Sequence, residues 1–215
     1  MYAATETTPY APAQVAPGQI EFWFEFGSPY SYLSAMRIEE LAAARGVYLA
    51  WRPFLLGPIF KELGWQSSPF LEQKEKLAHM WRDMERQCEK YALPWTRPTV
   101  FPRAAVLPLR VALACADEPW VGEFCKAVML QNFSEDKDVA LAENVTRALT
   151  ALTLPVASIM AQAQSDENKL ALRQQTARAR ALGVFGGPTF FVGDEMFWGN
   201  DRLEDALQLA AEEMA

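Results

Sequence analysis

Strand-like patterns occur only near the two ends of this chain, in residues 20–52 and 189–198. Between them, residues 68–182 place apolar side chains at helical intervals, with breaks at prolines. Any sheet must therefore be assembled from strands that lie far apart in the sequence. We expect an α/β fold with a large all-helical insertion.

The first part of the chain predicts a β-α-β unit. Residues 20–26 are short and aromatic, as in a buried strand. Ser28 then resembles a helix N-cap, with Pro29 at the first helical position and a helix continuing to Gly46. Residues 47–52 resume as a strand. The two strands should be parallel, with a right-handed crossover.

The helical stretch has recognisable first and last members. The first begins with Ser68 as cap and Pro69 at its first position, and one apolar stripe continues to Tyr91. The last begins near Ser165, has acidic residues in its first turn, and ends at Gly183.

The C-terminal part predicts a hairpin followed by a helix. Residues 189–192 and 195–198 are strand-like, and glycine stands first in the connection between them, as in a type II′ turn. Residues 199–201 then cap a closing helix. Its inward stripe comprises Leu203, Ala206, Leu207 and Ala210.

This pattern divides the chain into three parts. Residues 1–19 are expected to be a disordered tail, since they have neither the basic start nor the apolar run of a secretory signal. Residues 20–67 and 183–215 form one domain that contains the strands, and residues 68–182 form a helical insertion domain. No segment approaches the roughly 20 apolar residues of a membrane span, so we expect a cytoplasmic protein without a membrane partner.

Charge and composition exclude several kinds of function. A net charge of −7, without a basic run, opposes binding to nucleic acid. The three cysteines are an odd number and lack C-x-x-C spacing, so we expect no disulfide framework. One histidine, His79, and no Cys/His cluster leave too few ligands for a zinc site, so we expect no metal.

Two segments have local conformations that suit chemistry. In residues 27–31 a strand ends in a tight turn at a helix N-terminus, where free N–H groups stabilise anions and thiolates. Ser28 is either a helix cap or a functional hydroxyl there. In residues 183–189 glycines precede Pro188, which makes the Gly187–Pro188 bond a candidate for the cis form; the alternative is an ordinary loop.

Together these segments resemble the thioredoxin superfamily, in which the turn before the first helix faces a cis-proline loop. Residues 28–31, Ser-Pro-Tyr-Ser, occupy the position of the redox C-x-x-C motif. Because a hydroxyl cannot cycle through a disulfide, dithiol chemistry is excluded. Residues 184–203 and 28–33 resemble more specifically the 2-hydroxychromene-2-carboxylate isomerases and the related kappa-class glutathione transferases.

The resemblance implies a glutathione site. Ser28 would hold the glutathione sulfur as thiolate, and Gly187, next to Pro188, would pair with the glutathione main chain as an added strand does. The residues implied for the γ-glutamyl end are Trp198, Gly199, Asn200 and Asp201, with Asp201 accepting from its ammonium.

The implied reaction is cis–trans isomerisation of a small unsaturated aromatic acid by reversible thiolate addition, with reduced glutathione as cofactor. A glutathione transferase or thiol peroxidase, and a non-catalytic glutathione-binding protein, are the alternatives. Lys61 matches a lysine of the kappa-class relatives and is either a substrate-anion contact or a solvated charge. The resemblance also implies a homodimer.

The substrate part of the resemblance is weaker. The naphthalene-pathway isomerases carry polar side chains for the aromatic acid where this chain has apolar residues, near positions 70–71 and 104–105. Four aromatic residues are candidates for an apolar pocket beside the sulfur, with the core as the alternative location: Trp65, Phe70, Trp81 and Trp95.

Overall fold

The structure, a computed structural model, describes residues 16–214, and its first strand is β1 (Gln19–Phe24). Most of the expected N-terminal tail, residues 1–15, lies outside the described residues. The strand begins one residue before the expected boundary, because Gln19 already pairs with Tyr48 of the neighbouring strand. In residues 16–214 no helix combines the length and the apolar character of a membrane span.

Four strands form one sheet in the order β2-β1-β3-β4, with β2 (Tyr48–Pro53) parallel to β1, as predicted. β3 (Thr189–Val192) runs antiparallel to β1 and places Thr189 opposite Trp23. Pro188 therefore lies at the carboxyl end of β1, where the Ser28 turn begins. β4 (Glu195–Trp198) completes the predicted hairpin.

The hairpin turn has the predicted glycine conformation. Gly193 has φ +53°, and Asp194 is not among the described residues with positive φ. A type I′ turn needs positive φ at both central residues, whereas a type II′ turn needs it only at the first. The connection is therefore of type II′, as expected.

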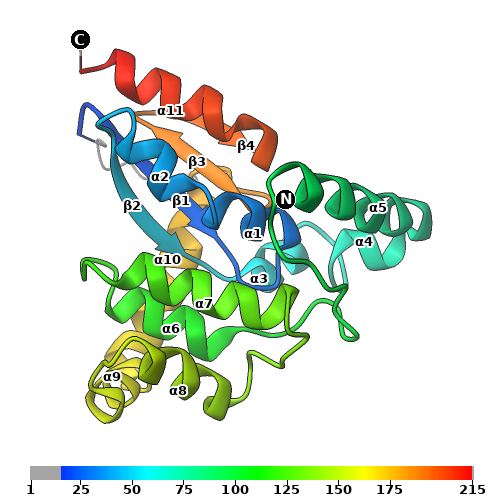
Figure 1. Cartoon of the computed structure of the whole chain (residues 1–215), viewed down its shortest axis with the longest axis vertical. Helices are drawn as coiled ribbons and strands as arrows, with labels where there is room; N and C mark the ends of the chain where they lie inside the picture. Colours follow the sequence, from blue (N-terminus) through cyan, green and yellow to red (C-terminus); the bar gives the residue numbers. More distant parts are fainter. Residues whose placement is uncertain (1–15, 215) are drawn as a thin grey trace, which may run out of the picture.

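Helices cover the sheet and fill the stretch between β2 and β3 (Figure 1). They are α1 (Pro29–Ala35), α2 (Ile38–Ala43), α3 (Leu56–Glu62), α4 (Pro69–Glu72), α5 (Lys74–Lys90), α6 (Val106–Ala114), α7 (Val121–Phe133), α8 (Ala142–Ala151), α9 (Val156–Ala163), α10 (Asp166–Ala181), the 3₁₀ turn η1 (Asn200–Arg202) and α11 (Leu203–Glu212). In Figure 1, α1 and α2 lie in front of the sheet and α10 lies behind it.

Two expected helices are each divided, and one helix was not expected. The helix after Ser28 is interrupted at Arg37, which has φ −120° and whose backbone N–H donates to Ser34 O, three residues back, at 3.0 Å. The helix expected from Pro69 to Tyr91 is interrupted at Gln73, which has ψ +87°. The short helix α3 follows β2 without a capping side chain, so no N-cap signal marks it.

The core is aromatic on both faces of β1. Phe22 stacks between Phe24 and Phe190, with ring centroids 5.1 and 5.4 Å away, on one face. Trp23 points to the other face and packs edge-on against Phe54 and Phe191. This alternation follows from the two-residue period of a strand with helices on both sides.

The helical stretch shares this core, since Phe26 after β1 packs edge-on against Phe124 of α7. The predicted stripe of α11, from Leu203 to Ala210, is fully buried. We propose that the boundaries near residues 67 and 183 mark where the helical stretch is inserted into the order of elements along the chain. They do not divide the core, because packing continues across them.

Candidate glutathione site

Ser28 lies in the turn between β1 and α1 and is 7% exposed. As the N-cap of α1, its Oγ accepts a hydrogen bond from the Ser31 N–H at 3.2 Å. The same hydroxyl donates to the carbonyl oxygen of Gly187 at 2.8 Å. Ser28 is therefore both a helix cap and the direct link between the turn and the proline loop.

The proline loop has the predicted geometry, because the Gly187–Pro188 bond is cis. Its carbonyl groups are already satisfied: Gly186 accepts from the Thr189 hydroxyl, Gly187 from Ser28, and Pro188 from the Gly199 N–H. The Gly187 N–H makes no hydrogen bond within residues 16–214. This N–H is the group with which Gly187 can pair with a ligand main chain.

Donors in the first turn of α1 are also nearly used up. Pro29 has no N–H, Ser31 donates to Ser28 Oγ, and Tyr32 donates to Ser28 O. The remaining N–H of this turn, that of Tyr30, has no acceptor among the described residues. A sulfur or oxygen anion at the turn would thus meet one free donor, the Tyr30 N–H, and would gain the Ser28 hydroxyl only if that hydroxyl leaves Gly187 O.

The site leaves one buried hydroxyl without a partner. Ser31 Oγ is fully buried and makes no hydrogen bond to the residues that the structure describes. It lies beneath Gly187, where an added Cβ would come within 3.2 Å of it. The free donors near the turn are the N–H groups of Tyr30 and Gly187, and this glycine lets the loop lie close to the turn. Such an arrangement suits a peptide that carries a thiol, because its sulfur and its main chain both need donors.

The four residues implied for the γ-glutamyl end follow β4 directly. Trp198 is 52% exposed and packs its ring against Phe185, with centroids 4.8 Å apart. Gly199 has φ +109°, a conformation that favours glycine, and its N–H holds the Pro188 carbonyl. Asp201 is exposed and forms an ion pair with the likewise exposed side chain of Arg202 at 3.4 Å, so a ligand ammonium would share its carboxylate with Arg202.

Asn200 has a structural contact in addition to its expected role. It is 7% exposed, and its Oδ1 accepts from Ser34 Oγ and from the Arg37 guanidinium, both at 3.1 Å. Only its NH₂ group is free of hydrogen bonds to the described residues. Asn200 therefore joins η1 to α1 and to Arg37, which stands between α1 and α2. It can offer a ligand its NH₂ donors but not its oxygen.

A tyrosine–aspartate pair beside this region was not evident from the sequence. The Tyr30 hydroxyl donates to Asp83 Oδ2 of α5 at 2.8 Å. Burial, together with the charges of Asp83 and Asp201, raises the pKa of Tyr30 above its usual range. The pair spans 53 residues, and no local pattern could have identified it.

A buried acid precedes the turn and was likewise missed. Glu25 is 9% exposed and its Oε2 accepts from the Gly27 N–H at 2.9 Å. Burial raises the pKa of this carboxyl to about 8, against the opposing effect of that hydrogen bond. An acid in an otherwise aromatic strand end was the available signal.

A second polar network fixes the other side of the turn. The Asn132 Nδ2 donates to Phe26 O at 2.9 Å, and Asn132 Oδ1 accepts from Arg103 at 3.0 Å. Arg103 is 7% exposed and also pairs with Asp136. The residues before Ser28 are thereby tied to α7 and to the loop before α6.

The remaining candidates lie outside this cluster. Lys61 is exposed in the last turn of α3, and its ammonium makes no hydrogen bond or ion pair within the described residues. Trp81 and Trp95 lie together, with centroids 6.0 Å apart, and Phe70 packs against the core. Trp65 makes no aromatic contact with them in the part of the chain described.

Two other kinds of centre to consider within residues 16–214 are a metal site and a reactive thiol. The described residues contain no group of His, Cys, Asp and Glu that could hold a metal ion. The three cysteines are buried, and burial raises the pKa of Cys88 and Cys115 to about 11. Such thiols are poor nucleophiles at neutral pH.

The proteins to which this chain is similar match it over most of its length. The sequence profile of the DSBA-like thioredoxin domain matches residues 19–210. A 2-hydroxychromene-2-carboxylate isomerase from Sphingobium xenophagum is 28% identical over 86% of this chain and 94% of its own. Glutathione S-transferase kappa 1 from Caenorhabditis elegans is 23% identical over 88% of this chain and 91% of its own.

The structural comparison agrees with these matches. The solved structure of a 2-hydroxychromene-2-carboxylate isomerase superposes with a TM-score of 0.80 at 25% identity, covering 91% of this chain and 95% of that one. The expected thioredoxin-like fold, and the resemblance to the isomerases, are confirmed.

Proposed function

The chain belongs to the DSBA-like thioredoxin domain family, and from that premise we propose that it is a glutathione-dependent isomerase of acids of the 2-hydroxychromene-2-carboxylate type. The observation that carries this proposal is the contact of the Ser28 hydroxyl with the Gly187 carbonyl at 2.8 Å, where related folds hold a cysteine. Similarity to proteins named as isomerases and as kappa-class transferases supports an enzyme.

Each residue of the site has a proposed task. Ser28 turns its hydroxyl from Gly187 O to the cofactor sulfur, and the Tyr30 N–H is the second donor. The Gly187 N–H pairs with the cofactor main chain, and Asp201 accepts from its ammonium. Glutathione, when bound, would supply a sulfur nucleophile that adds reversibly to the unsaturated acid. Fixed donors stabilise negative charge without reorganising during the reaction.

The first test is calorimetric titration with reduced glutathione. Ser28→Ala should bind at least tenfold more weakly than the wild type, because a charged sulfur loses its side-chain donor. Ser165→Ala is the matched control, since Ser165 caps α10 through the same type of bond, at 3.1 Å. Equal glutathione affinity in Ser28→Ala and the wild type would contradict the role of Ser28.

Turnover separates the three candidate functions. An isomerase converts 2-hydroxychromene-2-carboxylate and returns glutathione unchanged; a transferase or peroxidase consumes it; a binding protein does neither. The kappa-class similarity keeps the transferase as the second candidate. The homodimer and the cytoplasmic location are also proposals, and light scattering of the purified chain checks the first.

A further inference from the structure

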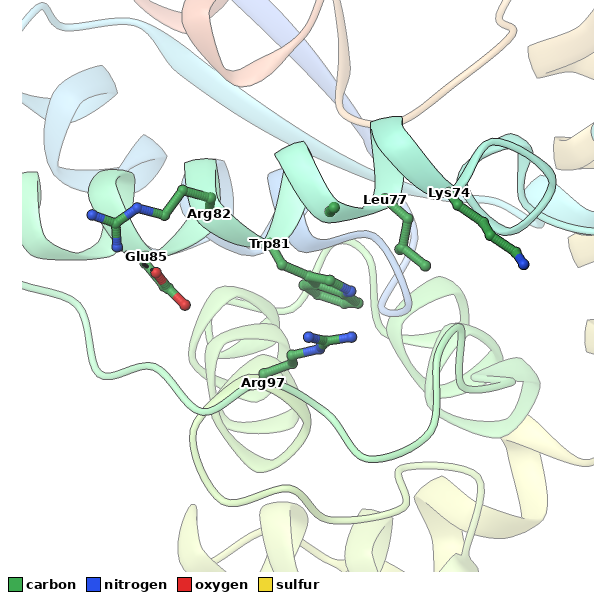
Figure 2. Close-up of a pocket in the computed structure, with 7 residues that line it drawn as sticks. Lys74, Leu77, Trp81, Arg82, Glu85 and Arg97 are labelled. Carbon is green, nitrogen blue, oxygen red and sulfur yellow. Dashed lines mark hydrogen bonds and ion pairs between the residues drawn. The ribbon is translucent and has the colours of Figure 1, made fainter.

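A hollow of about 350 Å³ lies between α5 and the loop that follows it, on the side of α5 away from α1. Figure 2 shows it from the front: the indole of Trp81 and the guanidinium of Arg97 face each other, and Leu77 and Lys74 lie toward one end. Its volume is within the range of small-molecule sites. None of the residues assigned above to the glutathione site lines it.

The charge of the hollow is opposite to that of the chain. Lys74, Arg82 and Arg97 line it against one acid, Glu85, in a chain of net charge −7. Arg82 is paired with Glu85 at 2.6 Å. Neither Lys74 nor Arg97 has an ion pair among the described residues, so both cations are available to an anion.

The wall of the hollow is aromatic and has an unused donor. Trp81 is 5% exposed, yet its indole N–H has no acceptor within residues 16–214. The Arg97 guanidinium lies 5.0 Å from the Trp81 ring centroid. Buried polar groups in folded proteins nearly always have partners, so an orphan N–H beside two free cations indicates a missing acceptor.

The hollow is connected to the Ser28 turn through one short segment. Phe101 packs edge-on against Trp81, with centroids 4.8 Å apart. Two residues later, the Arg103 carbonyl oxygen would lie 2.9 Å from a Cβ on Gly27. Residues 101–103 therefore contact both the wall of the hollow and the turn before Ser28.

We infer that this hollow binds the carboxylate-bearing end of an aromatic acid, with Arg97 and Lys74 as the anion contacts and Trp81 as the ring contact and N–H donor. Because the hollow faces away from α1, it is a second ligand site, separate from the Ser28 site and independent of the function proposed for that site. A ring can lie on the indole while the carboxylate accepts charge-assisted hydrogen bonds.

The test uses the full chain and the probe 2-naphthoate, a bicyclic aryl carboxylate, in calorimetric titrations. Arg97→Gln should weaken binding about tenfold or more, and Arg97→Lys should weaken it less. Trp81→Phe should weaken binding while keeping an aromatic wall. Arg86→Gln is the matched control, because Arg86 is exposed on the same helix without lining the hollow. The neutral 2-naphthamide should bind at least tenfold more weakly than the acid.

Three outcomes would overturn the inference: equal affinity of 2-naphthoate for Arg97→Gln and Arg86→Gln, equal affinity of the wild type for acid and amide, or no binding at millimolar probe. A glutathione titration of the same samples separates this failure from that of the proposed function. Glutathione binding without 2-naphthoate binding would contradict only the ligand site in the hollow. Binding of 2-naphthoate without glutathione binding would contradict only the proposed isomerase function.

Discussion

The hydroxyl of Ser28 donates to the carbonyl oxygen of Gly187, which lies 159 residues further along the chain. This hydrogen bond uses the hydroxyl proton that Ser28 would donate to a thiolate. Cofactor binding must therefore break it and replace it with a hydrogen bond from Ser28 to the cofactor sulfur. Ser28 Oγ also accepts a hydrogen bond from the Ser31 N–H. Binding and local stability are therefore coupled at a single side chain.

Ser28→Ala should lower the free energy of unfolding by about 1 kcal/mol, the usual cost of losing an N-cap. Ser165→Ala should cost a similar amount, because its side chain accepts the equivalent bond from Asn168. Urea denaturation of the two variants without ligand measures both values. A loss of several kcal/mol in Ser28→Ala alone would show that the Gly187 contact dominates.

Gly187→Ala should destabilise the site, and Ser31→Ala should relieve the damage. An added Cβ would lie 3.2 Å from Ser31 Oγ but at ordinary distances from Leu56 and Phe54. Overpacking of this kind costs about 1–3 kcal/mol. Ser31→Ala alone should be nearly neutral, since its hydroxyl has no partner among the described residues.

A double-mutant cycle measures this coupling. The double variant should be more stable than Gly187→Ala, and thermal denaturation of the four proteins gives the interaction energy. Simple additivity of the two single effects would mean that the conflict lies elsewhere in the loop.

The buried Glu25 predicts an unusual dependence of stability on pH. Its pKa is about 8 in the folded protein and near the ordinary 4.5 when unfolded. Between these values the folded state keeps a proton that the unfolded state has lost, so this group makes stability fall as pH rises. The slope approaches about 1.4 kcal/mol per pH unit and disappears above pH 8.

Glu25→Gln should remove this slope, because the amide stays neutral while its oxygen can still accept from Gly27 N–H. Urea midpoints measured across the window from the unfolded to the folded pKa give the comparison. Parallel curves for the variant and the wild type would show that Glu25 is ionised in the folded protein.

The order of elements along the chain, the hairpin and the cap at Ser28 could be predicted because their signals are local. A proline after a serine and a glycine first in a turn are constraints on adjacent residues. By contrast, long-range hydrogen bonds such as those of Asn132, Arg103 and Asp83 join residues far apart in the sequence. No pattern near these residues identifies their partners. The break at Arg37 was missed because no proline or glycine near it marks the end of the first helix.

Asn132 should be required for the stability of the turn before Ser28. It is 1% exposed and joins Phe26 O to Arg103, so Asn132→Ala leaves buried groups without partners. The expected loss is roughly 1–3 kcal/mol for each group left unsatisfied. Urea denaturation measures it, and the nearby exposed Lys137→Ala is a control expected to change little. A neutral Asn132→Ala would show that water replaces the amide.

Replacing Ser28 and Ser31 by cysteines should convert the site to thiol–disulfide exchange. The pair keeps the spacing of a redox motif, and Ser28 Oγ already lies 3.2 Å from the Ser31 backbone nitrogen. A thiol at position 28 would be favoured as thiolate by the first-turn donors. The double variant should form a disulfide with an oxidant and catalyse insulin reduction with dithiothreitol, whereas S28C alone should form only mixed disulfides. Mass spectrometry after alkylation distinguishes these products. Failure of the double variant to oxidise would mean that the buried position of Ser31 prevents its side chain from reaching the first cysteine.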